Sequence, residues 1–221
     1  MHIDVIIPTV ARPQLLRDTI NSLAASTHKD LAVFVIVDGN AELFEMVARW
    51  KVAVLFNRRR RDWVFSMNRA LQYARGDAVV YASDDLVFEP NCIETAAALL
   101  VQNTPALDGL VAITQSVKGC STAFGMMGRT FIERFPSRQV FCPDYVHYAS
   151  DFELGRFARS IGRLQLCAEA KVLHHRPKDK TWNLAKPIET RDITIQTQRA
   201  AKGLLWGADF ERLTKEEGIA R

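Results

Sequence analysis

The chain has 221 residues, of which 48% are hydrophobic and 24% are charged, and its formal net charge is +4. These values are ordinary for a globular protein, and the length suits one domain with a small appendage. Neither a run of about 18 apolar residues nor the basic start of a signal peptide is present. We therefore predict a cytoplasmic protein whose mild positive charge favours an anionic ligand without requiring nucleic acid. No C-x-x-C spacing occurs, and we expect reduced, mostly buried thiols at Cys92, Cys120, Cys142 and Cys167.

The first half of the sequence alternates strand patterns with helix patterns. Apolar runs at 3–7, 31–37, 52–56 and 78–82 predict four buried strands. Helices are predicted after Pro13, where Leu16, Ile20 and Leu23 share one face, over 43–50, and over 67–74, where Gly76 follows. This order implies an α/β fold with a mostly parallel central sheet flanked by helices on both faces.

The pattern loosens after residue 90. We expect a helix over 93–101, a strand over 110–114, a loop or irregular strand over 116–128, a helix over 150–161 and short strands at 164–167 and 170–173. Beyond Pro177 the chain turns polar, and two amphipathic helices are predicted over 191–206 and 208–217. We therefore predict a compact domain at 1–176 and a C-terminal helical tail at 177–221.

Two adjacent carboxylates, Asp84 and Asp85, follow the buried strand at 78–82. Acids at the carboxyl end of such a strand face the crevice in which open α/β sheets bind ligands. Two carboxylates held close repel each other by roughly 4 kcal/mol at an effective dielectric near 20. A divalent cation such as Mg²⁺ or Mn²⁺ bound between them would remove this repulsion. The alternative is a solvated Asp-Asp turn, which is common.

Several familiar nucleotide and hydrolase motifs are absent from the sequence. It has no G-x-x-x-x-G-K-[ST], no G-x-G-x-x-G after the first strand and no G-x-S-x-G. These absences argue against a P-loop enzyme, a Rossmann dinucleotide site and an α/β-hydrolase nucleophile.

Seven short motifs follow one another at fixed places in the chain. They are V-I-I-P-T-V-A-R-P at 5–13, V-I-V-D-G at 35–39, N-R-A at 68–70, A-R-G-D at 74–77, Y-A-S-D-D at 81–85, S-D at 150–151 and V-L-H at 172–174. Together they resemble the inverting glycosyltransferases of family 2, which have the GT-A fold. The resemblance covers about residues 3–176, with two departures. Ser83 stands where the family's D-x-D motif has its first aspartate, and Ser150 stands where an acidic residue is usual.

The resemblance implies a nucleotide-diphosphate sugar donor, in our prediction a UDP-sugar, with an Mn²⁺ or Mg²⁺ ion and inversion at the sugar. It makes Asp151 the general base and Asp85 and His174 the metal ligands. In the run of four arginines at 58–61, we expect Arg58 to bind the diphosphate or an anionic acceptor and most of the others to be solvated. The nucleotide contacts are predicted at Pro8, Thr9, Arg12, Asp38, Asn68 and Asp84.

Structural alternatives stand beside these roles. Asp38 could form a turn before Gly39, His174 could bind backbone, Asn68 could lie on a helix surface, and Ser150 with Asp151 could cap a helix. The acceptor is expected to be a glycan, a small molecule or a modified DNA base. We expect it to lie near Asp151 under residues 123–129, where Met126 and Met127 offer apolar contact.

Three other functions remain open from the sequence. One is a sugar-1-phosphate nucleotidyltransferase, although the turn at 8–13 has no glycine. A second is a nucleic-acid-binding protein, or a transferase that modifies a DNA base, in which the arginine run contacts phosphates. The third is a sugar-nucleotide binder without catalytic activity.

Overall fold

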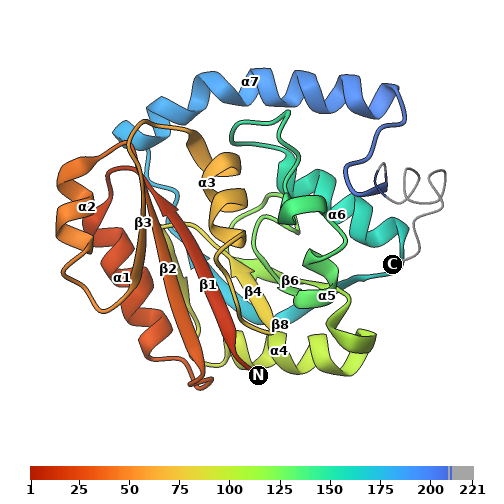
Figure 1. Ribbon diagram of the computed structural model, residues 1–221, viewed down its shortest axis with the longest axis horizontal. Coiled ribbons are helices and arrows are strands. Elements are labelled where there is room, and N and C mark those ends of the chain that lie inside the picture. Colours follow the sequence, from red (N-terminus) through yellow and green to blue (C-terminus); the bar gives the residue numbers. More distant parts are fainter. Residues whose placement is uncertain (209, 211–221) are drawn as a thin grey trace.

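The computed structural model describes residues 1–208 and 210, and Figure 1 shows their arrangement. In this part of the chain, one eight-stranded sheet has the order β3-β2-β1-β4-β7-β6-β8-β5. The first four strands are parallel, β7 is antiparallel to β4 and β6, β8 is parallel to β6, and β5 is antiparallel to β8. The strands are β1 (Ile3–Thr9), β2 (Leu31–Asp38), β3 (Ala53–Asn57), β4 (Ala78–Tyr81), β5 (Leu86–Phe88), β6 (Leu110–Gln115), β7 (Gly125–Gly128) and β8 (Leu164–His174).

Helices cover both faces of the sheet, as the sequence predicts for this α/β class. They are α1 (Pro13–Ala24), α2 (Ala41–Val47), α3 (Asp62–Leu71), α4 (Cys92–Asn103), α5 (Arg129–Ile132), α6 (Ser150–Ser160) and α7 (Lys180–Ala201). Two short 3-10 turns, Pro105–Leu107 and Pro136–Arg138, follow α4 and α5.

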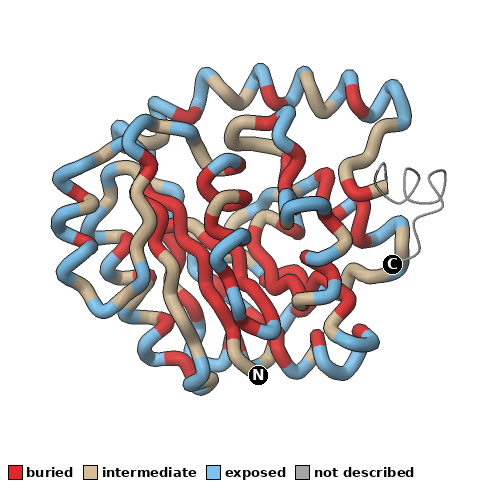
Figure 2. The backbone as a smooth tube through the Cα atoms, viewed as in Figure 1, coloured by how far each residue is buried: buried red, intermediate tan, exposed pale blue. Residues whose placement is uncertain are grey.

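Two hydrophobic cores lie on opposite faces of the sheet, because successive side chains of a strand point to opposite sides. In β1, Val5 and Ile7 pack with α1, α2 and α4, while Ile6 packs with α3, α5 and α6. Figure 2 shows the resulting buried interior. The whole of β1 is buried, which explains its continuous apolar sequence.

Several element boundaries differ from those predicted. Residues 125–128 form the central strand β7, β5 was not predicted, and β8 is one continuous strand with a register irregularity opposite Ile113 and Thr114. Helix α3 begins at Asp62 rather than 67, and α7 begins at Lys180 rather than 191. The helix predicted over 208–217 lies largely outside the described residues.

The segment after residue 177 packs onto the α/β domain instead of extending away from it. In Figure 1, α7 crosses the molecule above α3 and α6. Its Asp192 is fully buried and accepts hydrogen bonds from the backbone N–H groups of 146–148. Its Arg199 pairs with Glu153 of α6 and with Asp144. Within the described residues, no helix has the length and apolarity that crossing a bilayer requires.

Candidate active site

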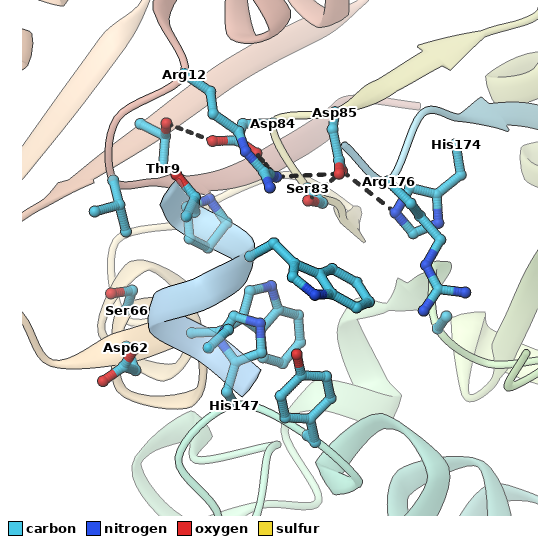
Figure 3. A pocket seen from close by; sticks show the side chains of 18 of the residues that line it. Thr9, Arg12, Asp62, Ser66, Ser83, Asp84, Asp85, His147, His174 and Arg176 are labelled. Carbon is cyan, nitrogen blue, oxygen red and sulfur yellow. Dashed lines mark hydrogen bonds and ion pairs between the residues drawn. The ribbon is translucent and has the colours of Figure 1, made fainter. Parts of the chain in front are cut away.

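A cavity of about 290 Å³ lies where the carboxyl ends of β1, β2 and β4 meet. Thr181, Trp182 and Ala185 of α7 form part of its wall, and Figure 3 shows side chains from separate elements pointing into it. This position agrees with the crevice in which open α/β sheets bind ligands. The cavity brings together most of the residues singled out in the sequence, namely Pro8, Thr9, Arg12, Asp38, Asp84, Asp85, Asp151 and His174.

Asp84 and Asp85 are both buried at the end of β4, each about 4% exposed. Asp84 accepts hydrogen bonds from the Thr9 hydroxyl at 2.6 Å and from Nη1 of Arg12 at 3.3 Å. Burial and the adjacent charge of Asp85 nevertheless raise the pKa of Asp84 to about 6. The pair is therefore not a solvated turn, and its mutual repulsion is only partly compensated by the protein.

The carboxylate of Asp85 is better stabilised than that of Asp84. Its Oδ1 accepts from the Ser83 hydroxyl at 2.7 Å and lies 3.4 Å from Nε2 of His174, while its Oδ2 accepts from Arg12 at 3.1 Å. Burial opposes ionisation, but the hydrogen bonds from His174 and Ser83 and the Arg12 charge hold the pKa of Asp85 below its ordinary value. Ser83 thus supports Asp85 at the position where the D-x-D motif has an aspartate.

Arg12 is the central cation of the site. Its Nη1 bonds both Asp84 and Asp85, and its Nε and Nη2 bond the two carboxylate oxygens of Asp179, just before α7. Carboxylates thus occupy the guanidinium on both sides. Asp179 also accepts from the backbone N–H of Trp182 and so caps α7.

Asp38 faces the cavity but its carboxylate is already bonded within the chain. Oδ1 accepts from Asn57 and from the backbone N–H of Arg61, and Oδ2 accepts from the backbone N–H groups of Arg61 and Asp62. Burial raises the pKa of Asp38, and these hydrogen bonds act in the opposite direction. Asp38 therefore holds the start of α3 in place, through contacts with Asn57 and residues 61–62 rather than within a turn at Gly39.

Two predicted nucleotide contacts need correction. Asn68 is buried in α3, donates to the carbonyl of Phe141 and accepts from its N–H, and is outside the set of described residues that line the cavity. Both ends of the Asn68 side-chain amide are therefore occupied by the backbone of Phe141. Arg58 is exposed and is also outside that set, whereas Arg60 lines the cavity. The backbone of Arg60 turns inward against Gly39, where an added Cβ would lie 2.8 Å from the Arg60 nitrogen.

Asp151 lies in the first turn of α6 and is half-buried in the cavity wall. Its backbone carbonyl accepts from the Thr122 hydroxyl at 2.9 Å, which ties α6 to the loop before β7. Burial raises the pKa of Asp151, and among the described residues no salt bridge compensates its charge. The capping alternative is wrong, because the N-cap residue is Ala149 and no side chain of the described residues caps this helix.

Part of the wall opposite the acids was missed from the sequence. The sequence offers Trp63 and Trp182 as rings that could stack on a sugar or a base, and both line the cavity, but it does not single out His147, Tyr148 and Arg176, which line it as well. The guanidinium of Arg176 lies 5.5 Å from the centre of the Trp182 ring. The expected contact from Met126 and Met127 is wrong, because both side chains are fully buried in the sheet, while Ala123 and Phe124 line the cavity.

The donor atoms fit a divalent cation that arrives with a phosphate ligand. Among residues 1–208 and 210, no group of three His, Cys, Asp or Glu side chains is placed to hold a metal ion by itself. Mg²⁺, however, is often bound by one or two carboxylates together with substrate phosphates. Asp85 and His174 are adjacent and both face the cavity, so they supply two protein ligands of this kind.

Fold and site together define an α/β protein of the nucleotide-sugar transferase type, and the comparisons with known proteins agree. The glycosyl transferase family 2 model matches residues 4–158, and the chain therefore belongs to this family. A curated relative, the glucosyl-dolichyl phosphate glucuronosyltransferase of Haloferax volcanii, is 28% identical over an alignment of 114 residues. The alignment covers 48% of this chain and 36% of the relative.

Solved structures with the same GT-A fold confirm the predicted architecture. The mannosyltransferase PcManGT from Pyrobaculum calidifontis, in complex with GDP-Man and Mn²⁺, has a TM-score of 0.65 and 17% identity over 84% of this chain. S. aureus TarS 1–349 in complex with UDP-GlcNAc has a TM-score of 0.64 and 15% identity over 81% of this chain. This chain covers 60% of each of those two chains.

Proposed function

We propose that this protein transfers a sugar from a nucleotide-diphosphate donor to an acceptor hydroxyl with inversion at the anomeric carbon. One observation carries the proposal: a buried acid pair and a separate acid of raised pKa, Asp151, line the same cavity. The family and the nucleotide sugars bound by the two structural relatives support this choice over a nucleotidyltransferase.

The donor diphosphate would lie against the end of β4. Asp85 and His174 would hold an Mn²⁺ or Mg²⁺ ion there, which supplies Lewis-acid stabilisation of the leaving diphosphate when bound. Thr9 and Arg12 lie beside the acid pair, and the charge of Arg12 offsets the carboxylates that would otherwise repel the diphosphate. We propose a UDP-sugar or a GDP-sugar as the donor.

Asp151 is suited to act as the general base. An acceptor hydroxyl would lose its proton to the Asp151 carboxylate while its oxygen forms a bond to the anomeric carbon. The bond from that carbon to the diphosphate oxygen breaks on the opposite side, and the diphosphate leaves with the electron pair. A raised pKa favours proton uptake near neutral pH, and burial gives Asp151 such a pKa.

The acceptor would be a carbohydrate. Trp63, Tyr148 and Trp182 present aromatic rings to the cavity, and such rings supply large apolar surface with a polar edge. A sugar ring offers both an apolar face and hydroxyl groups. The alternative, a DNA acceptor, would place the exposed Arg58 and Arg59 on backbone phosphates outside the cavity.

The test is an assay of nucleoside diphosphate release and sugar transfer with a panel of UDP- and GDP-sugars and glycan acceptors in Mn²⁺. Asp151→Asn should keep donor affinity and lose at least about 100-fold in transfer rate, the range for a missing general base. Asp18→Asn, a carboxylate outside the cavity on α1, is the matched control and should behave as wild type. Loss of donor binding in Asp151→Asn would instead assign this residue a structural role.

A further inference from the structure

Gln115 is a polar residue of the cavity wall with no part in the reaction described above. It is the last residue of β6, and its side chain lies between His174 and the loop at 116–124 that follows β6. Its Nε2 donates to the backbone carbonyl of Cys120 at 3.1 Å, and its Oε1 lies 2.8 Å from Nδ1 of His174. Gly119 packs against the same amide, since an added Cβ there would lie 3.1 Å from Nε2 of Gln115. The amide is therefore fixed at both ends.

These contacts decide which ring nitrogen of His174 carries a hydrogen. A backbone carbonyl only accepts hydrogen bonds, so the amide nitrogen of Gln115 must face Cys120 and the amide oxygen must face His174. That oxygen also only accepts, so Nδ1 of His174 is the donor of the bond between the two side chains. In a neutral imidazole the other nitrogen, Nε2, then carries the lone pair.

Nε2 of His174 is directed at the acid pair. It lies 3.4 Å from Oδ1 of Asp85, and Figure 3 shows the two groups facing each other. A hydrogen on Nε2 or a metal ion can fill the space between these atoms. Two neighbouring ligands of an octahedral Mg²⁺ ion, each about 2.1 Å from the metal, are roughly 3 Å apart. The separation of Nε2 and Oδ1 is close to this spacing, so the orientation that Gln115 imposes is one that suits a metal ligand.

The fold brings His174 to Gln115 through an irregularity between β6 and β8. The pairing of the two strands shifts after Ile113 and bypasses residues 168–170 of β8. As a result, the backbone N–H of His174 donates to the hydroxyl of Ser116 at 3.0 Å, directly after β6. Irregularities of this kind often redirect side chains beside active sites. Here both the backbone and the ring of His174 are held by two consecutive residues at the end of β6.

We propose that Gln115 is a positioning residue, which holds His174 in the tautomer and orientation that bind the divalent cation of the donor. This inference rests on the proposed nucleotide-sugar donor and its ion. A histidine that binds a metal usually donates its other ring N–H to a fixed acceptor, and loss of that acceptor typically costs about 10- to 100-fold in metal affinity. Phe124 packs edge-on against the same ring, with the ring centres 5.0 Å apart, and so restricts its rotation. Through Cys120, Gln115 also joins this ligand to the loop at 116–124.

The experiment measures Mn²⁺ binding at saturating UDP or GDP, whichever wild type binds. Electron paramagnetic resonance gives the concentration of free Mn²⁺, and the nitrogen modulation of its spin echo reports an imidazole ligand. Gln115→Met keeps the length of the side chain but removes the oxygen acceptor, so it should lower Mn²⁺ affinity about 10- to 100-fold and weaken the nitrogen signal. Gln115→Glu keeps an oxygen that faces His174 and should retain the nitrogen signal. Gln102→Met, at an exposed position of α4, is the matched control and should behave as wild type.

A double-mutant cycle separates a role through His174 from a general structural role. His174→Ala should itself weaken Mn²⁺ binding and remove the nitrogen signal. In that background Gln115→Met should have no further effect on Mn²⁺ affinity, because no ring is left to position. Thermal unfolding of each variant establishes that the fold is kept.

Three results would overturn the role of Gln115. Unchanged Mn²⁺ affinity and nitrogen signal in Gln115→Met, or an equal effect of this variant with and without His174, overturns this inference alone. A wild type that binds nucleotide and Mn²⁺ without a nitrogen signal also overturns it alone, because His174 is then not a ligand. Absence of binding by both UDP and GDP overturns the proposed function as well.

Discussion

Arg12 and Asp179 form a bidentate ion pair, with Nε–Oδ2 and Nη2–Oδ1 distances of 2.9 and 3.0 Å. The pair joins the turn after β1 to the N-terminus of α7, although the two residues are 167 positions apart in the sequence. The family match ends at residue 158, yet α7 supplies part of the cavity wall. Arg12 therefore links the wall formed by α7 to the acid pair, because it also contacts Asp84 and Asp85.

Asp179→Ala should loosen the start of α7. The variant loses the helix cap, worth about 1 kcal/mol, and leaves Arg12 without its outer partner. The ion pair itself adds little stability, because the Asp179 side chain is 37% exposed. We expect a fall in Tm of roughly 2–4 °C, faster amide hydrogen exchange over 179–186 and a several-fold higher KM for the donor. Asp18→Ala is the control, and exchange over 179–186 that matches wild type would contradict the role of Asp179.

Asp84 predicts a specific dependence of stability on pH. Its pKa is about 6 in the folded protein against an ordinary value of 3.8, so the folded state binds more protons than the unfolded state between these values. The stability linked to Asp84 is therefore complete below about pH 3.8 and is lost as the pH rises through about 6, a cost of about 3 kcal/mol at pH 7. Asp84→Asn carries no such cost at any pH.

Urea unfolding at pH 4, 5, 6 and 7 measures this difference. The free energy of unfolding of Asp84→Asn, relative to wild type, should increase by about 2.4 kcal/mol from pH 4 to pH 7. The lost bonds to Thr9 and Arg12 add a constant offset that does not alter this increase. Asp18→Asn should stay parallel to wild type. A relative stability of Asp84→Asn that is flat or falls with pH would rule out burial of an uncompensated charge at this position.

The sequence predicted the parts of the fold that depend on local pattern. The four parallel strands are continuous apolar runs, and Asp84 and Asp85 follow one of them directly. Both the sheet and the acid pair at its edge could therefore be predicted. Strand β7 could not be predicted from the sequence, because Gly-Met-Met-Gly becomes a strand only through pairing with β4 and β6 on either side. Pairings of this kind depend on contacts far apart in the chain.

The sequence predicts site residues whose type has one dominant use. It misses those whose role depends on which hydrogen-bond partners the fold brings to them. Asn68 is a polar residue in a suggestive place, but the backbone of Phe141 bonds both ends of its amide. Choosing Arg60 over Arg58 required the path of the backbone past Gly39, which a run of four arginines does not reveal.

Gly155 tests how Asp151 is held. Alanine normally stabilises a helix by about 1 kcal/mol relative to glycine. At position 155, however, an added Cβ would lie 2.7 Å from Cγ2 of Thr122 and closer still to its hydroxyl oxygen, which bonds the backbone carbonyl of Asp151. Overpacking of this kind typically costs 1–3 kcal/mol. We therefore expect Gly155→Ala to be about 1–2 kcal/mol less stable than wild type and to transfer sugar more slowly.

A double-mutant cycle with Thr122→Ala isolates the contact. Removing the Thr122 side-chain oxygen and methyl should restore stability to Gly155→Ala, with a coupling energy of at least about 1 kcal/mol between the two positions. Transfer should stay slow in the double variant, because the hydrogen bond to the Asp151 carbonyl is still missing. Ser160→Ala, on the same helix and away from Thr122, controls for changes in α6 as a whole. A double variant no more stable than Gly155→Ala alone would mean that Thr122 does not meet this face of α6, and that Asp151 is positioned by other contacts.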